Sequence, residues 1–213
     1  MKVKFIFFLT LFLVQTGLSQ IVNYPTDWDD LHHNSGWTIV TQKERLCVYK
    51  KKLKVSPVPA IKVELNTRAN PSDLMEIIWA VDKYPVNLPS AHSTDAGFIE
   101  RFDSNHQLAW QVIDIPFLSP RMYQFNHQRN LNKIDWVKST NKHIIQNYKD
   151  LIVPAVNFGS WEVKTSEEET TLIYRACTDP AGSVPSWLVD RVSMWYIPQM
   201  LLDLENTALQ VDK

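Results

Sequence analysis

One segment constrains the fold of this chain more than any other: residues 177–189, with the sequence C-T-D-P-A-G-S-V-P-S-W-L-V. It has the pattern of a strand end, a tight loop and the start of a long C-terminal helix. Pro180 has no N–H to donate to a neighbouring strand, so it ends the strand. Gly182 can adopt a positive φ in the turn, Ser183 can cap the helix, and Pro185 suits the first helical turn.

The order of strand, D-P-A-G-S-V-P-S-W-L-V and helix closely resembles the C-terminal signature of START domains, the lipid-transfer family related to steroidogenic acute regulatory protein. The resemblance extends over roughly residues 26–209. It implies an α+β helix-grip fold, START/Bet v 1-like, in which a curved antiparallel β-sheet of about nine strands wraps around a long C-terminal helix and leaves an internal hydrophobic cavity. It also implies that the cavity holds a lipid or other hydrophobic ligand.

Residue patterns along the chain predict an order of elements that agrees with this layout. Strands are expected where apolar and polar residues alternate or β-branched and aromatic residues gather. The predicted strands cover residues 37–41, 46–50, 60–67, 98–102, 108–115, 122–127, 134–138, 161–165 and 171–176. Helices are predicted near residues 27–33, 70–81 and 185–206. The order is therefore helix, three strands, helix, six strands and helix.

The first 19 residues predict a cleavable signal peptide. Lys2 and Lys4 precede an apolar run over residues 5–14, and Gly17 and Ser19 form a small-x-small cleavage pattern. The alternative is an uncleaved membrane anchor, but a span needs roughly 20 apolar residues. We therefore expect residues 1–19 to be removed and residues 20–213 to form one domain that is secreted or periplasmic.

Composition excludes one class of partner. The chain has 22 basic and 23 acidic residues, a net charge of −1 that becomes −3 without the two lysines of the leader. A weakly acidic chain without a basic cluster argues against nucleic acid and against strong electrostatic docking on anionic membranes. We expect a monomer with a hydrophobic ligand and at most transient membrane contact.

The two cysteines, Cys47 and Cys177, have two possible states in an oxidising compartment. One is a disulfide and the other is a pair of buried thiols in strands. The START layout implies that their strands are near each other but not adjacent. Two strand spacings are roughly 9–10 Å, which is too far for a bridge, so free thiols are favoured.

The predicted C-terminal helix has an unusually wide apolar side. Leu188, Val192, Trp195 and Tyr196 fall on one side at 100° per residue. Pro198 removes a backbone hydrogen bond and is expected to kink the helix. Periodicity alone leaves open whether such a helix packs on a solid core or lines a tunnel. The resemblance favours a tunnel, with a volume of roughly 300–1,000 Å³.

The resemblance also implies one polar pair inside the tunnel. START domains often carry P-x-x-x-R-D before a strand, and residues 116–122 match it loosely, with Arg121 present and Met122 in place of the Asp. In the sterol-binding branch this Arg pairs with an acidic residue in the cavity, and that position falls on Asp95. The alternative is a surface arginine and a loop aspartate that never meet.

Aromatic and apolar residues complete the expected site. The chain has eight tryptophans, which can form a large aromatic core or stack on a ligand. Trp110 and Trp195 are the two that we expect to face the cavity. Phe117 and Leu118 form the apolar tip of a proline-flanked loop, residues 116–120. We expect a ligand to enter where this loop and the final helix beyond Pro198 open.

No catalytic or metal-binding motif is visible. None of the histidines has a metal-ligand spacing on a single element; they are His32, His33, His92, His106, His127 and His143. The chain has no G-x-S-x-G elbow and no glycine-rich phosphate loop. We expect no metal, no cofactor and no catalytic residue, and therefore a binding protein. The alternative is a cyclase- or hydrolase-like enzyme on the same scaffold, with Asp95 or His92 as the acid–base group.

Overall fold

The structure is a computed structural model that describes residues 22–140, 146–167, 169–182 and 184–211. The predicted signal peptide and the predicted cap Ser183 lie outside the described residues. Within the described part, the elements follow the predicted order of helix, three strands, helix, six strands and helix, with a few additional short turns. No helix in that part is both long and apolar enough to span a membrane.

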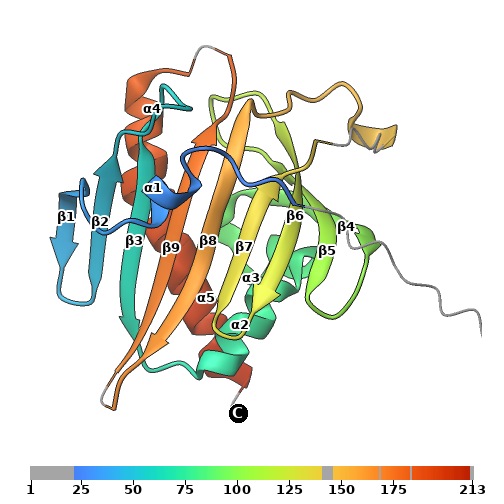
Figure 1. Cartoon of the computed structure of the whole chain (residues 1–213). Helices are drawn as coiled ribbons and strands as arrows, with labels where there is room; N and C mark the ends of the chain where they lie inside the picture. The colour runs from blue at the N-terminus through green and yellow to red at the C-terminus, as the bar shows by residue number, and fades with distance from the viewer. Residues whose placement is uncertain (1–21, 141–145, 168, 183, 212–213) are drawn as a thin grey trace, which may run out of the picture.

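The described strands form one curved antiparallel sheet, as predicted (Figure 1). Its spatial order is β1-β2-β3-β9-β8-β7-β6-β5-β4. The strands are β1 (Thr38–Lys43), β2 (Leu46–Lys51), β3 (Ala60–Thr67), β4 (Ser93–Arg101), β5 (His106–Ile113), β6 (Arg121–Asn130), β7 (Lys133–Lys138), β8 (Val156–Thr165) and β9 (Thr170–Asp179). The long connection between β3 and β4 crosses to the far edge of the sheet, so β3 and β9, which are far apart in the sequence, pair side by side.

Helices cover the two faces of the sheet unequally. The short α1 (Trp28–His32) lies on one face, whereas α2 (Pro71–Trp79), α3 (Tyr84–Asn87) and α5 (Ile197–Val211) lie on the other (Figure 1). The remaining helical turns are η1 (Val81–Lys83), η2 (Pro89–Ala91), η3 (Gln146–Tyr148), α4 (Ser186–Arg191) and η4 (Val192–Tyr196). We call the face that bears α2, α3 and α5 the inner face and the face under α1 the outer face.

The final helical region is interrupted where the sequence predicts a break. Residues Val192–Tyr196 form a π-helical turn that ends two residues before Pro198. Pro198 cannot donate to the carbonyl one turn earlier, and a π-helical turn is one way in which a helix accommodates such a loss. Ser193 adds a hydrogen bond from its Oγ to the carbonyl of Val189, at 2.7 Å. The region therefore has a built-in irregularity over the sheet.

The main core lies between the inner face and the helices. It contains Val63 and Leu65 from β3, Leu74 and Ile78 from α2, and Leu204 from α5, all of which are fully buried. A smaller cluster beneath α1 includes Cys177. Cys47 and Cys177 are free thiols, as predicted, because β3 lies between their strands.

Candidate functional site

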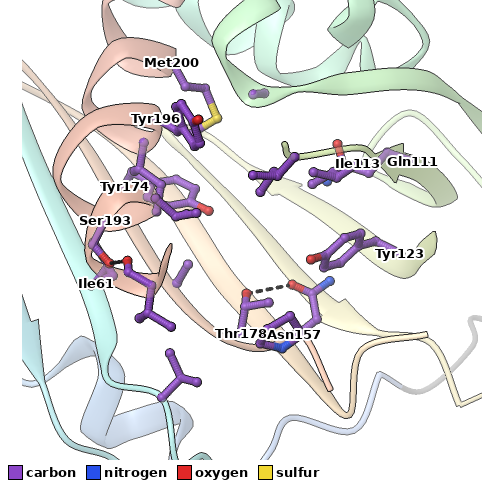
Figure 2. A pocket seen from close by; sticks show the side chains of 18 of the residues that line it. Ile61, Gln111, Ile113, Tyr123, Asn157, Tyr174, Thr178, Ser193, Tyr196 and Met200 are labelled. Carbon is purple, nitrogen blue, oxygen red and sulfur yellow. Dashed lines mark hydrogen bonds between the residues drawn. The ribbon is translucent and has the colours of Figure 1, made fainter. Parts of the chain in front are cut away.

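A cavity of about 200 Å³ lies between the inner face of the sheet and the final helical region (Figure 2). Apolar side chains from both layers dominate its wall. They include Ile61, Phe125, Trp136, Trp161 and Ala176 from the sheet, and Leu188, Val192, Tyr196, Ile197 and Met200 from α4, η4 and α5. The tunnel that the resemblance implied is therefore present as a cavity.

The cavity is smaller than the roughly 300–1,000 Å³ expected of a small-molecule site. Large rings on the inner face take up part of the space beside it. Trp136, Trp161 and Tyr174 stand on adjacent strands, and the centroids of the Trp161 and Tyr174 rings are 4.5 Å apart. These rings occupy space that smaller side chains would leave open.

No described Asp, Glu, Lys or Arg lines the cavity. Its polar groups are uncharged side chains from strands and helices. The main ones are Gln111, Tyr123, His127, Asn157, Tyr174, Thr178 and Ser193. A wall of this kind suits an uncharged ligand, since burying a charge without a partner is costly.

Four of the predicted ligand-binding residues lie in the cavity wall. Leu188 is in α4, while Val192 and Tyr196 begin and end the π-helical turn. Leu118 reaches the wall from the loop before β6. Their positions agree with the sequence analysis, and their contact with a ligand stays a prediction.

The prediction that Trp195 faces the cavity is wrong. Its side chain is 70 % exposed and does not line the cavity. The sequence analysis assumed a regular α-helix with 100° per residue, but residues 192–196 form a wider π-helical turn. Each residue of that turn is rotated by less than 100°, which brings Val192 and Tyr196 together and leaves Trp195 outside.

Phe117 and Trp110 also lie outside the cavity wall. Phe117 has a positive φ of 70° and is 86 % exposed, with its ring centroid 6.0 Å from that of Trp187. Trp110 belongs to β5, where its neighbour Gln111 lines the cavity. Successive strand residues point to opposite faces, so Trp110 points to the outer face, where it lies 5.5 Å from the ring of Tyr148.

The predicted pair of Arg121 and Asp95 is also wrong, because the two residues lie on opposite faces of the sheet. Asp95 is opposite Val112, which is opposite Met122, so these three share one face. Arg121 precedes Met122 and therefore shares the inner face with Tyr123. The Asp95 carboxylate instead accepts a hydrogen bond from the Tyr148 hydroxyl on the outer face.

Arg121 joins two loops at the end of the cavity instead of binding a carboxylate. Its side chain is buried, and it donates hydrogen bonds to the carbonyls of Pro180 and Ala181, each at 3.2 Å, and to the carbonyl of Ser119. Pro180 and the neighbouring Leu118 line the cavity. Arg121 thus holds the loop before β6 against the loop before α4.

We expect an Arg121→Met variant to lose about 2 kcal/mol of unfolding free energy, because three carbonyls lose a charged donor. Chemical denaturation measures this change, and hydrogen exchange should show faster opening of residues 116–120 and 179–182. The matched control is Arg68→Met, since Arg68 is exposed. Equal stability of the two variants would contradict the role of Arg121 as a tie between the loops.

His127 is a buried, neutral histidine in the cavity wall. Its Nδ1 lies 3.0 Å from the amide nitrogen of Gln107, which also donates to the carbonyl of Trp79 at 2.9 Å. Its ring stacks on the indole of Trp79, with centroids 5.0 Å apart. Burial lowers the pKa of His127 to about 3, so the imidazole stays uncharged at neutral pH.

The lowered pKa predicts a pH dependence of stability. The unfolded chain binds a proton at His127 below about pH 6.5, whereas the folded chain does so only near pH 3. The free energy of unfolding should therefore fall by up to about 1.4 kcal/mol per pH unit from this residue as the pH drops from 6.5 towards 3. Denaturation of His127→Gln across that range should show a shallower slope, and an unchanged slope would contradict the prediction.

The sequence analysis missed most of the polar residues of the wall. Tyr123 and His127 were in a predicted strand, and their odd positions share a face with the apolar Phe125, which was the available signal. Asn157 precedes the predicted start of its strand and carried no such signal. Tyr174 was in a predicted strand, but nothing in the sequence marks which of its faces is inner.

Comparison with known proteins shows the fold of this chain. No protein-family model matches the sequence, and no curated protein matches it. A STAR-related lipid transfer protein from Xanthomonas axonopodis is similar in structure, with a TM-score of 0.71 and 16 % identity over 82 % of this chain and 99 % of that one. Human STARD10 is similar with a TM-score of 0.72 and 17 % identity, over 90 % of this chain and 82 % of that one.

A more distant likeness is to the di-domain ARO/CYC protein StfQ from the steffimycin biosynthetic pathway. Its TM-score is 0.54, with 15 % identity over 72 % of this chain and 51 % of that one. All three identities are low, so the likenesses establish the fold alone. That fold is the START helix-grip fold.

Proposed function

We propose that this protein binds a lipid or another hydrophobic small molecule in its internal cavity. The observation that carries the proposal is the wall of that cavity, which is mostly apolar and includes no charged side chain among the described residues. An apolar cavity without a charged group favours the transfer of hydrophobic surface out of water. The structural likeness to a protein named for lipid transfer supports the same class of ligand.

We further propose that the protein carries or senses this ligand outside the cytoplasm, as a monomer. The support is the N-terminal pattern of two lysines, a short apolar run and a small-x-small site, which is typical of a secretory signal. A hydrophobic molecule has little solubility in such an aqueous compartment, and a closed apolar cavity keeps it out of water.

A route into the cavity passes between the two loops that Arg121 joins. Leu118 and Val184 line the cavity, while Phe117 and Trp187 pack together beside them, 86 % and 51 % exposed. This pair places apolar surface at the edge of the cavity. Brief membrane contact through the pair would let a hydrophobic ligand pass without entering water.

Binding is favoured over catalysis by the state of the cavity histidine. A general base needs a pKa near the working pH, and burial lowers the pKa of His127 to about 3. Its partner is the amide of Gln107 instead of a carboxylate. The other acid–base candidates, Asp95 and His92, do not line the cavity. The likeness to an ARO/CYC protein concerns the fold alone.

Native mass spectrometry of the purified protein, followed by organic extraction, tests the proposal. We expect a species heavier than the polypeptide that returns to the polypeptide mass after extraction, with a hydrophobic molecule in the extract. A protein that never carries or takes up a hydrophobic molecule would contradict the proposal.

A further inference from the structure

The cavity wall contains an amide whose orientation is fixed by its partners. The Oδ1 of Asn157 accepts hydrogen bonds from the indole N–H of Trp136, at 3.2 Å, and from the hydroxyl of Thr178, at 3.3 Å. An indole nitrogen can only donate, so the atom that faces it must be the oxygen. The NH₂ group of Asn157 is therefore directed away from Thr178 and towards Tyr123, as Figure 2 shows.

A second hydrogen-bond donor in the wall, Nε2 of His127, is assigned in the same way. The amide nitrogen of Gln107 lies within hydrogen-bond distance of both the Trp79 carbonyl and Nδ1 of His127, and a carbonyl can only accept. Nδ1 of His127 must then accept, which leaves the proton of the neutral ring on Nε2. His127 lines the cavity, and its Nε2 has no hydrogen-bond partner among the described residues.

Two phenols face the same space. The hydroxyls of Tyr123, in β6, and Tyr174, in β9, point into the cavity from the sheet (Figure 2), and neither has a hydrogen-bond partner within the described part of the chain. Burial raises the pKa of both, so both stay protonated. The cavity thus offers several N–H and O–H donors and no carboxylate that would accept from them.

From this arrangement we propose that the ligand is uncharged and carries a carbonyl oxygen, which accepts from the amide of Asn157 and the hydroxyl of Tyr123. The inference rests on the proposed function and narrows its ligand class. A buried donor without a partner is costly, and a carbonyl satisfies it without bringing a charge. A carboxylate or phosphate would enter a cavity with no described cation in its wall.

The size of the cavity narrows the class further. A dry cavity of roughly 150 Å³ holds one benzene molecule. The present cavity of about 200 Å³ therefore suits a ligand of one or two rings, or a short chain. The ligand class is a small hydrophobic ketone, aldehyde or ester instead of a diacyl lipid.

Three probes of one shape test the inference by calorimetry on the purified protein: 2-acetylnaphthalene, 2-ethylnaphthalene and 2-naphthoate. The pH is kept well above the pKa of a carboxyl group. We expect the ketone to bind roughly tenfold more tightly than the hydrocarbon, because it gains hydrogen bonds to fixed donors. We expect the carboxylate to bind most weakly of the three.

Variants assign the preference to the donors. Asn157→Leu and Tyr123→Phe should each reduce ketone binding, roughly tenfold and threefold, with little change for the hydrocarbon. Tyr84→Phe is the control, because Tyr84 also lines the cavity but its hydroxyl donates to the carbonyl of Ile78. Melting temperatures show whether each variant is folded, and Tyr123→Phe carries the test if Asn157→Leu is not.

Each other outcome overturns the inference in a recognisable way. Equal binding of ketone and hydrocarbon would remove the role of the donors and leave the proposed function intact. Tightest binding of the carboxylate would replace the uncharged ligand by an anionic one. Failure of all three probes to bind would overturn the inference, while the native mass spectrometry described above tests the proposed function separately.

Discussion

A Val192→Trp variant is expected to fold and to lose binding of 2-ethylnaphthalene by a factor of at least roughly 100. Val192 lies at the start of the π-helical turn and lines the cavity. An indole in its place fills much of a space of about 200 Å³. Filling a cavity with apolar atoms does not by itself destabilise a protein, so the melting temperature should stay close to that of the parent chain. Calorimetric titration and a thermal melt measure the two effects.

The matched control is Gln199→Trp, which adds the same ring at an exposed position of α5. It should bind the probe as the parent chain does. Unimpaired binding by Val192→Trp would mean that hydrophobic molecules bind elsewhere, and a large drop in its melting temperature would mean that the ring disrupts the core instead of filling the cavity.

The second large effect is expected at Gly159, where an alanine should lower the free energy of unfolding by about 3 kcal/mol. A Cβ atom at this position would lie 2.1 Å from the carbonyl oxygen of Arg175 and 2.3 Å from the indole of Trp136. Neither neighbour can move easily, because β8 and β9 are hydrogen-bonded along this stretch and the indole donates to Asn157. Denaturation in urea measures the change.

Gly97→Ala is the control for this substitution. A Cβ atom there would lie 3.1 Å from the indole nitrogen of Trp110, a side chain that can shift slightly. We expect a loss below about 1 kcal/mol. A Gly159→Ala variant as stable as Gly97→Ala would show that the sheet relaxes around the added methyl, and the close packing of Trp136 over β8 would no longer explain the glycine.

Much of the fold could be predicted from the sequence because its strong local signals agree with one another. The alternation over Ala60–Thr67 predicts β3 with its observed bounds, and the loop with Pro180 and Gly182 predicts the passage from β9 into the final helical region. Gly182 has the expected positive φ, of 76°. These features are determined by residues that lie close together along the chain, so a single sequence is enough to predict them.

The elements that were missed have weak local signals. The first half of β4 is Ser-Thr-Asp-Ala-Gly, which is poor in strand-forming residues, and pairing with β5 holds it in the sheet. The short α3, Tyr84–Asn87, begins beside a proline and is only four residues long. Its boundaries depend on packing against β4 and α5, which local patterns do not contain.

The candidate site was only partly predictable because it depends on which face of each strand is inner. Strand β5 has apolar residues on both faces, so periodicity could not show that Gln111 lines the cavity and Trp110 does not. The pair of Arg121 and Asp95 came from the resemblance, whose match is loose in this part of the chain, and the register of three strands places the two residues on opposite faces. Trp195 was misplaced because a π-helical turn has no simple sequence pattern.

Nuclear magnetic resonance of methyl-labelled protein with bound 2-ethylnaphthalene tests the central claim most directly. The claim is that hydrophobic molecules bind between the sheet and the final helical region. It predicts nuclear Overhauser effects from the probe to Ile61 on the sheet and to Leu188 and Val192 opposite, all of which line the cavity. Contacts only with exposed methyls such as those of Val86 and Leu131, which are 79 % and 91 % exposed, would contradict it.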